Sequence, residues 1–203
     1  MEYKHLDEEI KYDGSQIDPS WALKEVDVKG SSVVTWIGPM DITGENLRDF
    51  EDVGLDIKSD KMVHFIVEHF DIQPADIRTA YLRQRILVMI LSEALSEKKI
   101  VCRRRGDDLY INRTNPFDVY DGYDPCKLTV SIASVSISSS KIHFGVNLSS
   151  EGTPDDVNTI GLYELGDDLF NEDNIKDFVE IVARTYIREI NDIESDISKT
   201  RTV

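Results

Sequence analysis

The segment 128–148 alternates apolar and polar residues on both sides of a serine-rich turn at 138–140, and this pattern constrains the fold most strongly. A repeat of two residues is typical of a strand with one buried face, because successive side chains point to opposite sides. Two such runs joined by a short turn predict an antiparallel β-hairpin, with a β-bulge near Ala133 where the parity slips. We expect this hairpin to form the centre of a sheet. The alternating apolar positions are Leu128, Val130, Ile132, Ile142, Phe144, Val146 and Leu148.

Two further segments have the character of strands. Residues 100–111 contain two short β-rich runs around the tight-turn sequence 106–108, and this arrangement predicts a second hairpin. Residues 33–37 predict a strand that ends at Gly38, where glycine and proline indicate a turn. Residues 112–126 carry three turn signals and are expected to form a loop.

Helical spacing of apolar residues marks the other elements. It predicts a helix pair within 60–98, interrupted before Pro74, and a long amphipathic helix that begins near Asn174. Asp18 and Pro19 have the residue types of an N-cap and a first helical position, so they predict the start of a short helix.

The order of these elements predicts an α+β fold, in which helices pack on a mainly antiparallel sheet. The chain has 203 residues, of which 40% are hydrophobic, and this size and composition match one globular core. We therefore expect a single domain over residues 1–203.

The charge of the chain excludes several classes of partner. With 39 acidic and 23 basic residues, its formal net charge is -16, which repels phosphate backbones and anionic lipids. We expect no nucleic-acid partner and no membrane partner, and the apolar stretches are too short to span a bilayer. The N-terminal residues lack the features of a secretory signal, which predicts a cytoplasmic protein. Cys102 and Cys126 are expected to be reduced thiols, and the oligomeric state, including a homo-oligomer, stays open.

The most unusual local feature is a run of three arginines, Arg103 to Arg105, directly before Gly106. In an acidic chain this run concentrates positive potential, so it is a candidate anion site. The alternative is a charged turn in solvent, where ion pairs contribute little. Asp107 and Asp108 follow the glycine, and they either ligate a divalent ion or pair with the arginines.

Three residues near the 128–148 hairpin are further candidates. Lys127 stands at the start of a strand, where a lysine is usually a solvated edge charge. His143 faces away from the apolar row of its strand, so it either lines a site or is a hydrogen-bonded buried histidine. Gly145 loosens the strand or permits close approach of a ligand. His64 and His69 are five residues apart, unlike the four-residue spacing of a zinc helix, so we expect no metal site there.

Several strings identify the chain as a member of an archaeal family of unknown function, number 366. These strings span nearly the whole chain. They are Tyr-Asp-Gly-Ser-Gln at 12–16, Asp-Lys-Met-Val-His-Phe-Ile-Val-Glu-His-Phe-Asp at 60–71, Leu-Arg-Gln-Arg at 82–85, Arg-Arg-Arg-Gly-Asp-Asp-Leu-Tyr at 103–110, and His-Phe-Gly-Val-Asn-Leu-Ser-Ser-Glu-Gly-Thr-Pro at 143–154. The resemblance to this family implies no known activity.

A more distant resemblance carries more chemistry. Lipoate and biotin protein ligases and octanoyl transferases share, in order, an arginine-rich glycine turn, a strand opened by lysine, and a returning strand of the type His-Gly-x-x-x-Asn. The segments 104–110, 127–133 and 143–147 are similar in order and spacing. The resemblance implies the fold of these enzymes and of class II synthetases. It also implies that Lys127 contacts an acyl carboxyl or adenylate and is the catalytic residue.

The same resemblance implies a set of ligand-binding residues, which are Arg104, Arg105, Gly106, Asp107, Asp108, Ser131, His143, Gly145 and Asn147. Two departures weaken it. Asp107 and Asp108 stand where the ligases have more glycines, and no cysteine follows Cys126, so the cysteine nucleophile of octanoyl transferases has no counterpart.

The leading hypothesis is a ligase-like or acyltransferase-like enzyme that acts on a small carboxylate or acyl-adenylate ligand. In it, the arginines and Lys127 would bind the anionic group and stabilise developing negative charge. Two rivals stay open: a small-molecule-binding module without catalysis, and a structural subunit. Whether the chain is an enzyme, which substrate it takes and whether it uses ATP as a cofactor are not determined by the sequence.

Overall fold

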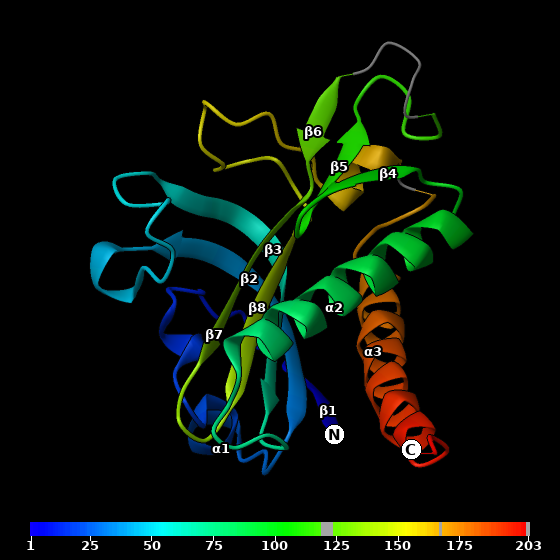
Figure 1. The fold of residues 1–203 in the computed structure, drawn as a ribbon. Coiled ribbons are helices and arrows are strands. Elements are labelled where there is room, and N and C mark those ends of the chain that lie inside the picture. Colours follow the sequence, from blue (N-terminus) through cyan, green and yellow to red (C-terminus); the bar gives the residue numbers. More distant parts are fainter. Residues whose placement is uncertain (119–123, 167, 202–203) are drawn as a thin grey trace.

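The computed structural model describes residues 1–118, 124–166 and 168–201. Its main element is a five-stranded sheet with the strand order β1-β2-β3-β8-β7 (Figure 1). The strands are β1 (Glu2–His5), β2 (Ser32–Ile42), β3 (Ile57–His69), β7 (Thr129–Val135) and β8 (Ser140–Asn147). All neighbours pair antiparallel except β1 and β2, which are parallel. The α+β expectation with a mainly antiparallel sheet is therefore confirmed.

A second, three-stranded sheet lies beyond one end of the first. It has the order β4-β5-β6, from β4 (Cys102–Arg105), β5 (Asp108–Asn112) and β6 (Pro125–Lys127). The helices are α1 (Trp21–Val26), α2 (Ile77–Glu97) and α3 (Ile175–Ile197), with short 3-10 turns at Ser15–Ile17, Gly44–Asn46 and Leu162–Leu165. No helix within the described ranges has the length and apolar character needed to cross a bilayer.

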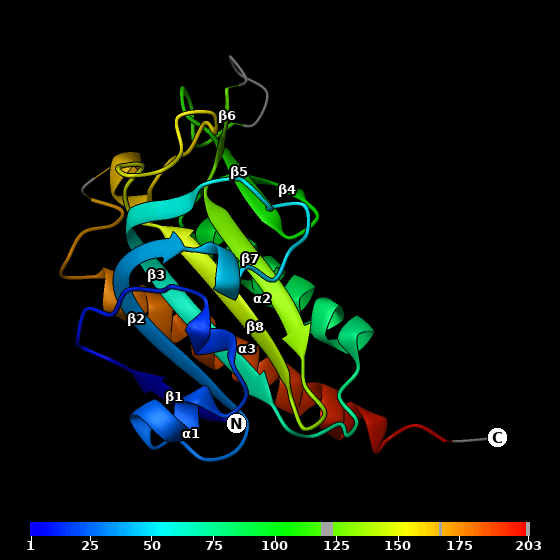
Figure 2. The ribbon, with the colours of Figure 1, turned by 90° about the vertical axis from the view of Figure 1, so that its left-hand side faces the viewer.

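The five-stranded sheet buries both of its faces. Helices α2 and α3 cover one face, and the N-terminal segment with α1 covers the other (Figures 1 and 2). On the helical face, Phe65 and Phe144 pack with Leu87 and Val182. On the opposite face, Trp36 belongs to a separate cluster with residues of the N-terminal segment. Burial on both sides contributes the main stabilisation, at roughly 25 cal/mol for each Å² of apolar surface removed from water.

Strand β3 corrects the sequence interpretation, which placed a helix over this region. Each residue of β3 from Met62 to His69 is buried. Central strands buried on both faces lack the alternation of a half-buried strand, so their apolar residues also match helical spacing by chance. Only the second helix of the predicted pair exists, as α2, and it begins at Ile77 behind an Asp76 side chain that accepts from the Thr79 amide.

The hairpin predictions are correct in position and wrong in two details. Strands β7 and β8 pair without interruption from Thr129↔Val146 to Val135↔Ser140, so there is no bulge at Ala133. The hairpin lies at the edge of the sheet, because β3 occupies its centre. The second hairpin is formed by β4 and β5 around Gly106, as predicted.

Other boundaries also differ from the expectations. Strand β2 continues past Gly38 with a register shift before Met40, where the sequence predicted a turn. Helix α1 begins at Trp21, because Ser20 adopts a positive φ of 60° and Asp18 forms an ion pair with Arg48 instead of a cap. The long helix predicted near Asn174 is confirmed as α3. In the predicted 112–126 loop, residues 119–123 lie outside the described residues.

Candidate functional site

A cavity of about 400 Å³ lies where the two sheets meet. Its walls come from the ends of β3, β7 and β8, from β5 and β6, and from the connecting segments 49–56 and 153–159. Charged and polar side chains are prominent in the lining, which includes Asp49, Glu51, Asp52, Asp56, Lys58, Asp107, Asp108, Lys127, Thr129, Ser131 and Asn147. Five of the ten residues predicted for the site, namely Asp107, Asp108, Lys127, Ser131 and Asn147, therefore meet in one cavity.

Lys127 is held in place by main-chain bonds on both sides. Its amide donates to the Asn158 carbonyl at 2.7 Å, and its carbonyl accepts from the Ile160 amide at 3.1 Å. In β5 its partner is Tyr110. This fixed backbone directs the Lys127 side chain toward Asp108, with Nζ 3.0 Å from Oδ2.

The Lys127–Asp108 pair is only partly exposed, at 28% for the lysine and 24% for the aspartate side chain. Burial raises the pKa of Asp108, and the nearby Lys127 ammonium opposes that shift. A carboxyl with a raised pKa gains a proton readily when further negative charge approaches. An anion that approaches Lys127 would raise the pKa of Asp108 further.

Asp107 is anchored to helix α2 by a polar network. The Gln84 side-chain amide donates to Asp107 Oδ2 at 2.9 Å and to Ser131 Oγ at 2.7 Å, and Ser131 donates to the same Asp107 oxygen at 2.8 Å. Arg85 lies 2.9 Å from Asp107 Oδ1 and also donates to Gln84. Because Gln84 is only 1% exposed, this network fixes the β4–β5 turn rigidly against the helix.

Asn147 contributes the most deeply buried amide of the lining, at 5% exposure. Its Oδ1 accepts from the Ser59 hydroxyl at 3.3 Å. Within the described part of the chain, its Nδ2 has no hydrogen-bond acceptor on the protein. The Nδ2 group of this lining residue can therefore donate to a ligand atom in the cavity.

The segment 49–56 adds negative charge to the cavity. Asp49, Glu51 and Asp52 follow one another closely, and burial together with the charges of Asp49 and Glu51 raises the pKa of Asp52. Lys58 forms an ion pair with Asp56 at 2.9 Å. The cavity lining consequently contains six carboxylates and two ammonium groups.

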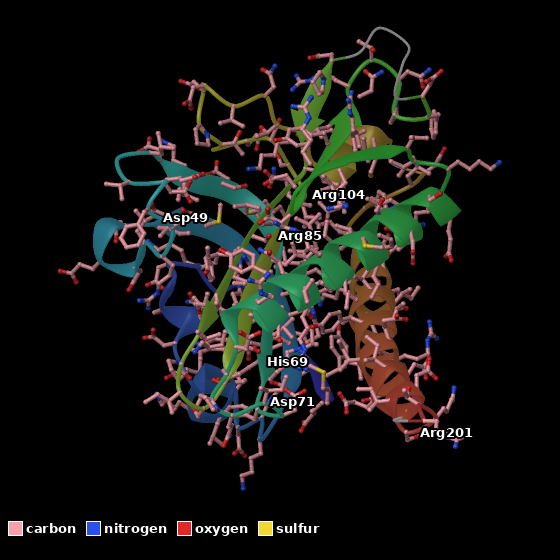
Figure 3. The ribbon with its side chains drawn as sticks, viewed as in Figure 1. Asp49, His69, Asp71, Arg85, Arg104 and Arg201 are labelled. Carbon is pink, nitrogen blue, oxygen red and sulfur yellow. The ribbon has the colours of Figure 1, made fainter. Side chains whose placement is uncertain are left out.

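The arginines of the β4–β5 hairpin lie outside the cavity lining. Arg104 donates to the Gly106 carbonyl at 2.6 Å, and Arg105 packs over the Tyr110 ring at 5.1 Å. Figure 3 shows Arg104 beside α2, away from Asp49 on the opposite side of the sheet. Both arginines and Gly106 are exposed, so the predicted convergence of the arginines with Lys127 is wrong. The sequence shows the charge of a run of arginines but not the direction in which their side chains point.

His143 and Gly145 lie near the cavity without lining it. His143 is 1% exposed, stacks on Tyr12 at 3.5 Å between ring centroids, and borders a separate space of about 30 Å³. A Cβ added to Gly145 would lie 2.9 Å from Met62 Cε and 3.0 Å from Val130 Cγ1, and both of these residues line the main cavity. A side chain at position 145 would therefore displace residues that line the cavity, and glycine avoids this clash.

Sequence reasoning missed Gln84, Arg85 and Asp52. The first two lie in the string Leu-Arg-Gln-Arg at 82–85, which helped to identify the family but did not indicate that these side chains contact the β4–β5 turn. Asp52 lies in the acidic segment 43–60, whose weak periodicity and two glycines predict a loop with at most one helical turn. Only the position of that segment beside β3 turns its carboxylates toward a cavity.

Comparison with known proteins places the chain among uncharacterised relatives. The family model described as "Domain of unknown function (DUF366)" matches residues 1–201. An uncharacterised protein of Methanocaldococcus jannaschii is 38% identical over 200 residues, which cover 94% of this chain and 80% of that protein.

Solved structures give the same lineage and a wider fold group. A protein of unknown function from Pyrococcus horikoshi is similar with a TM-score of 0.85 and 36% identity, over 100% of this chain and 98% of that chain. Biotin protein ligase from Aquifex aeolicus, in complex with biotin and ATP, is similar with a TM-score of 0.58 and 16% identity, over 94% of this chain and 70% of that chain. The second likeness extends to the fold alone, and it confirms the ligase-like fold that the sequence predicted.

Proposed function

Since the chain belongs to the family described as Domain of unknown function (DUF366) and has a fold like that of biotin protein ligases, we propose that it binds a small carboxylate-bearing molecule at Lys127. This molecule would be the substrate of a ligase-like or acyltransferase-like reaction. The observation that carries the proposal is a partly desolvated ammonium, that of Lys127, in a cavity of about 400 Å³. Cavities of this size hold small molecules.

The Lys127–Asp108 pair supports a carboxylate ligand. An anion that enters the cavity competes with Asp108 for the ammonium, and protonation of Asp108 relieves the repulsion between the two carboxylates. Asn147 adds a neutral amide that can donate to a carbonyl or carboxylate oxygen. Together these groups would bind the acid end of the ligand and stabilise negative charge that develops on it.

A covalent route through sulfur is not favoured by the geometry. Burial raises the pKa of Cys102 to about 12, so its thiol is a poor nucleophile. Cys126 is fully buried and accepts a hydrogen bond from Arg113 Nε at 3.2 Å. Neither thiol lines the cavity. The proposed chemistry therefore relies on positioning and electrostatics.

A second candidate is a binding module without catalysis. It is favoured by the outward direction of Arg104 and Arg105, which leaves the cavity with six carboxylates and two ammonium groups. Such a lining repels the phosphates of a nucleotide. If this candidate holds, the cavity binds the carboxylate molecule but does not activate it with ATP.

One experiment separates the two candidates. The purified protein is incubated with Mg-ATP, hydroxylamine and a pool of short-chain carboxylic acids, and both pyrophosphate and hydroxamates are measured. Acid binding in the absence of ATP is followed in parallel by calorimetry. The variants are Lys127→Met and, as a control, Lys58→Met, which removes the other cavity lysine.

The expected result is acid-dependent pyrophosphate release that Lys127→Met abolishes and Lys58→Met retains. Acid binding without pyrophosphate release would support the binding module instead. If no acid binds, or if binding ignores Lys127, the proposal is wrong.

A further inference from the structure

The charges that line the cavity do not balance each other. Both lysines are already paired, Lys127 with Asp108 and Lys58 with Asp56. Arg85 from α2 compensates Asp107. The remaining lining carboxylates, Asp49, Glu51 and Asp52, are called the loop carboxylates below. In the ranges 1–118, 124–166 and 168–201 they form no ion pair, although the Lys127 charge acts to lower the pKa of Asp52. Arg48, which also lines the small space beside His143, is paired with Asp18.

The loop carboxylates are not simply a solvated acidic surface. Asp49 and Asp52 are only partly exposed, and both line the main cavity as well as the small space beside His143. Neighbouring carboxylates that are partly desolvated repel each other, and the repulsion ends when a cation binds between them. This part of the cavity therefore favours a positive group.

Asn147 gives an independent sign of a ligand in the same cavity. Its side chain is more than nine-tenths buried and lines the cavity, and among the described residues its Nδ2 lacks an acceptor. With Lys127, it forms a donor end that suits a carboxylate or carbonyl oxygen. The donor end and the loop carboxylates border one cavity, so a single ligand can touch both.

We propose that the ligand is an amino carboxylic acid, with its carboxylate at Lys127 and Asn147 and its ammonium group at the loop carboxylates. This inference rests on the proposed function, because it names the class of carboxylate that the same cavity binds. It adds a requirement that a plain fatty or ring carboxylic acid does not meet. Charge complementarity at both ends also gives specificity, since the loop carboxylates would repel the second carboxylate of a diacid.

Four six-carbon probes test the two ends separately: 6-aminohexanoate, hexanoate, hexylamine and adipate. Their binding is measured by calorimetry at neutral pH, in the presence of EDTA so that a divalent cation cannot occupy the loop carboxylates. The variants are Asp52→Asn and Lys127→Met. Asp41→Asn is the matched control, because Asp41 is an exposed carboxylate paired with Lys11 and does not line the cavity. Thermal unfolding verifies that each variant is folded.

The wild type should bind 6-aminohexanoate at least about tenfold more tightly than hexanoate, the effect of one charge-assisted contact. Adipate should bind more weakly than hexanoate. Asp52→Asn should remove most of the preference for the amine while hexanoate binding is retained, and Asp41→Asn should change neither. Lys127→Met should weaken both acids and leave hexylamine unchanged.

Each alternative outcome has a distinct meaning. If hexanoate binds as tightly as 6-aminohexanoate and needs Lys127, the inference is overturned and the proposed function stands. If hexylamine binds as tightly as 6-aminohexanoate and Lys127→Met has no effect, Lys127 does not bind a carboxylate. Both the inference and the proposed function are then overturned. If no probe binds at millimolar concentration, both are also overturned.

Discussion

Three buried histidines should make the folded protein sensitive to mild acid. His64 stacks between Trp36 and Tyr12 and shares a 3.0 Å hydrogen bond with His143, while His69 bonds the Tyr186 hydroxyl at 2.8 Å. Burial lowers the pKa of His64 to about 4 and that of His69 to about 3. Burial, followed by the neighbouring His64, also lowers the pKa of His143 well below its usual value.

The sign of the effect follows from proton binding. Below about pH 6.5 the unfolded chain protonates each histidine, whereas the folded chain does not until much lower pH. The depressed pKa values therefore stabilise the fold fully above pH 6.5, and this stabilisation is lost as the pH falls. At pH 5 the loss is about 2 kcal/mol each for His64 and His69, and His143 adds to it. Asp52 and Asp108, whose pKa values are raised, reduce the net loss.

Chemical denaturation at a series of pH values between about 8 and 5 measures this loss directly. The unfolding free energy should fall increasingly steeply toward pH 5, by about 1.4 kcal/mol per pH unit for each proton taken up on unfolding. His64→Phe keeps an aromatic ring in the stack and should remove about one of these protons. His5→Gln, at a half-buried position on β1, is the control and should change the slope less. A wild-type uptake of less than one proton would refute the reasoning, because the imidazoles would then titrate in the folded state.

Three further outcomes are expected. Lys127→Met should lower the unfolding free energy by only about 1 kcal/mol, since Asp108 can take up a proton, and denaturation measures this effect. The same variant should bind a carboxylate ligand about tenfold to a hundredfold more weakly, as measured by calorimetry. Gln84→Ala should cost about 1–3 kcal/mol, because it leaves Asp107 and Ser131 without a buried donor, whereas the exposed Gln73→Ala should cost less than about 0.5 kcal/mol in the same denaturation assay. Gel-shift titration at physiological salt should detect no appreciable binding to DNA or RNA, and salt-sensitive submicromolar binding would contradict the charge argument.

The sequence predicted the strands whose residues alternate in polarity and missed the strand whose residues do not. Strands β7 and β8 alternate apolar with polar or small residues, so their period was visible, although every residue of β8 is buried. Strand β3 is covered on both faces, and its polar residues His64, Glu68 and His69 are as buried as its apolar ones. Because their hydrogen bonds come from distant segments, such as Ser20 and Ser139 for Glu68, local sequence offers no sign of them.

The candidate site, too, could be predicted only in part from the sequence. Lys127, Asp108 and Asn147 were predicted from the order of motifs along the chain, and they do border one cavity. Arg104 and Arg105 belong to the same motif but are exposed outside the cavity, and the turn that follows them is held against α2 by the Arg85–Asp107 ion pair. The loop carboxylates carry no motif, and only the packing of their segment beside β3 brings them to the cavity.

The pairing of β3 with β8 also has a consequence for how the chain assembles. These strands are neighbours in the sheet, but α2, the whole three-stranded sheet and β7 separate them along the sequence. Closing so long a loop is entropically costly, and topologies with distant pairings fold slowly. Until β3 and β8 meet, each exposes an unpaired edge and apolar faces to other molecules. Refolding yield should therefore fall as protein concentration rises, because the free edges of β3 and β8 pair with strands of other molecules.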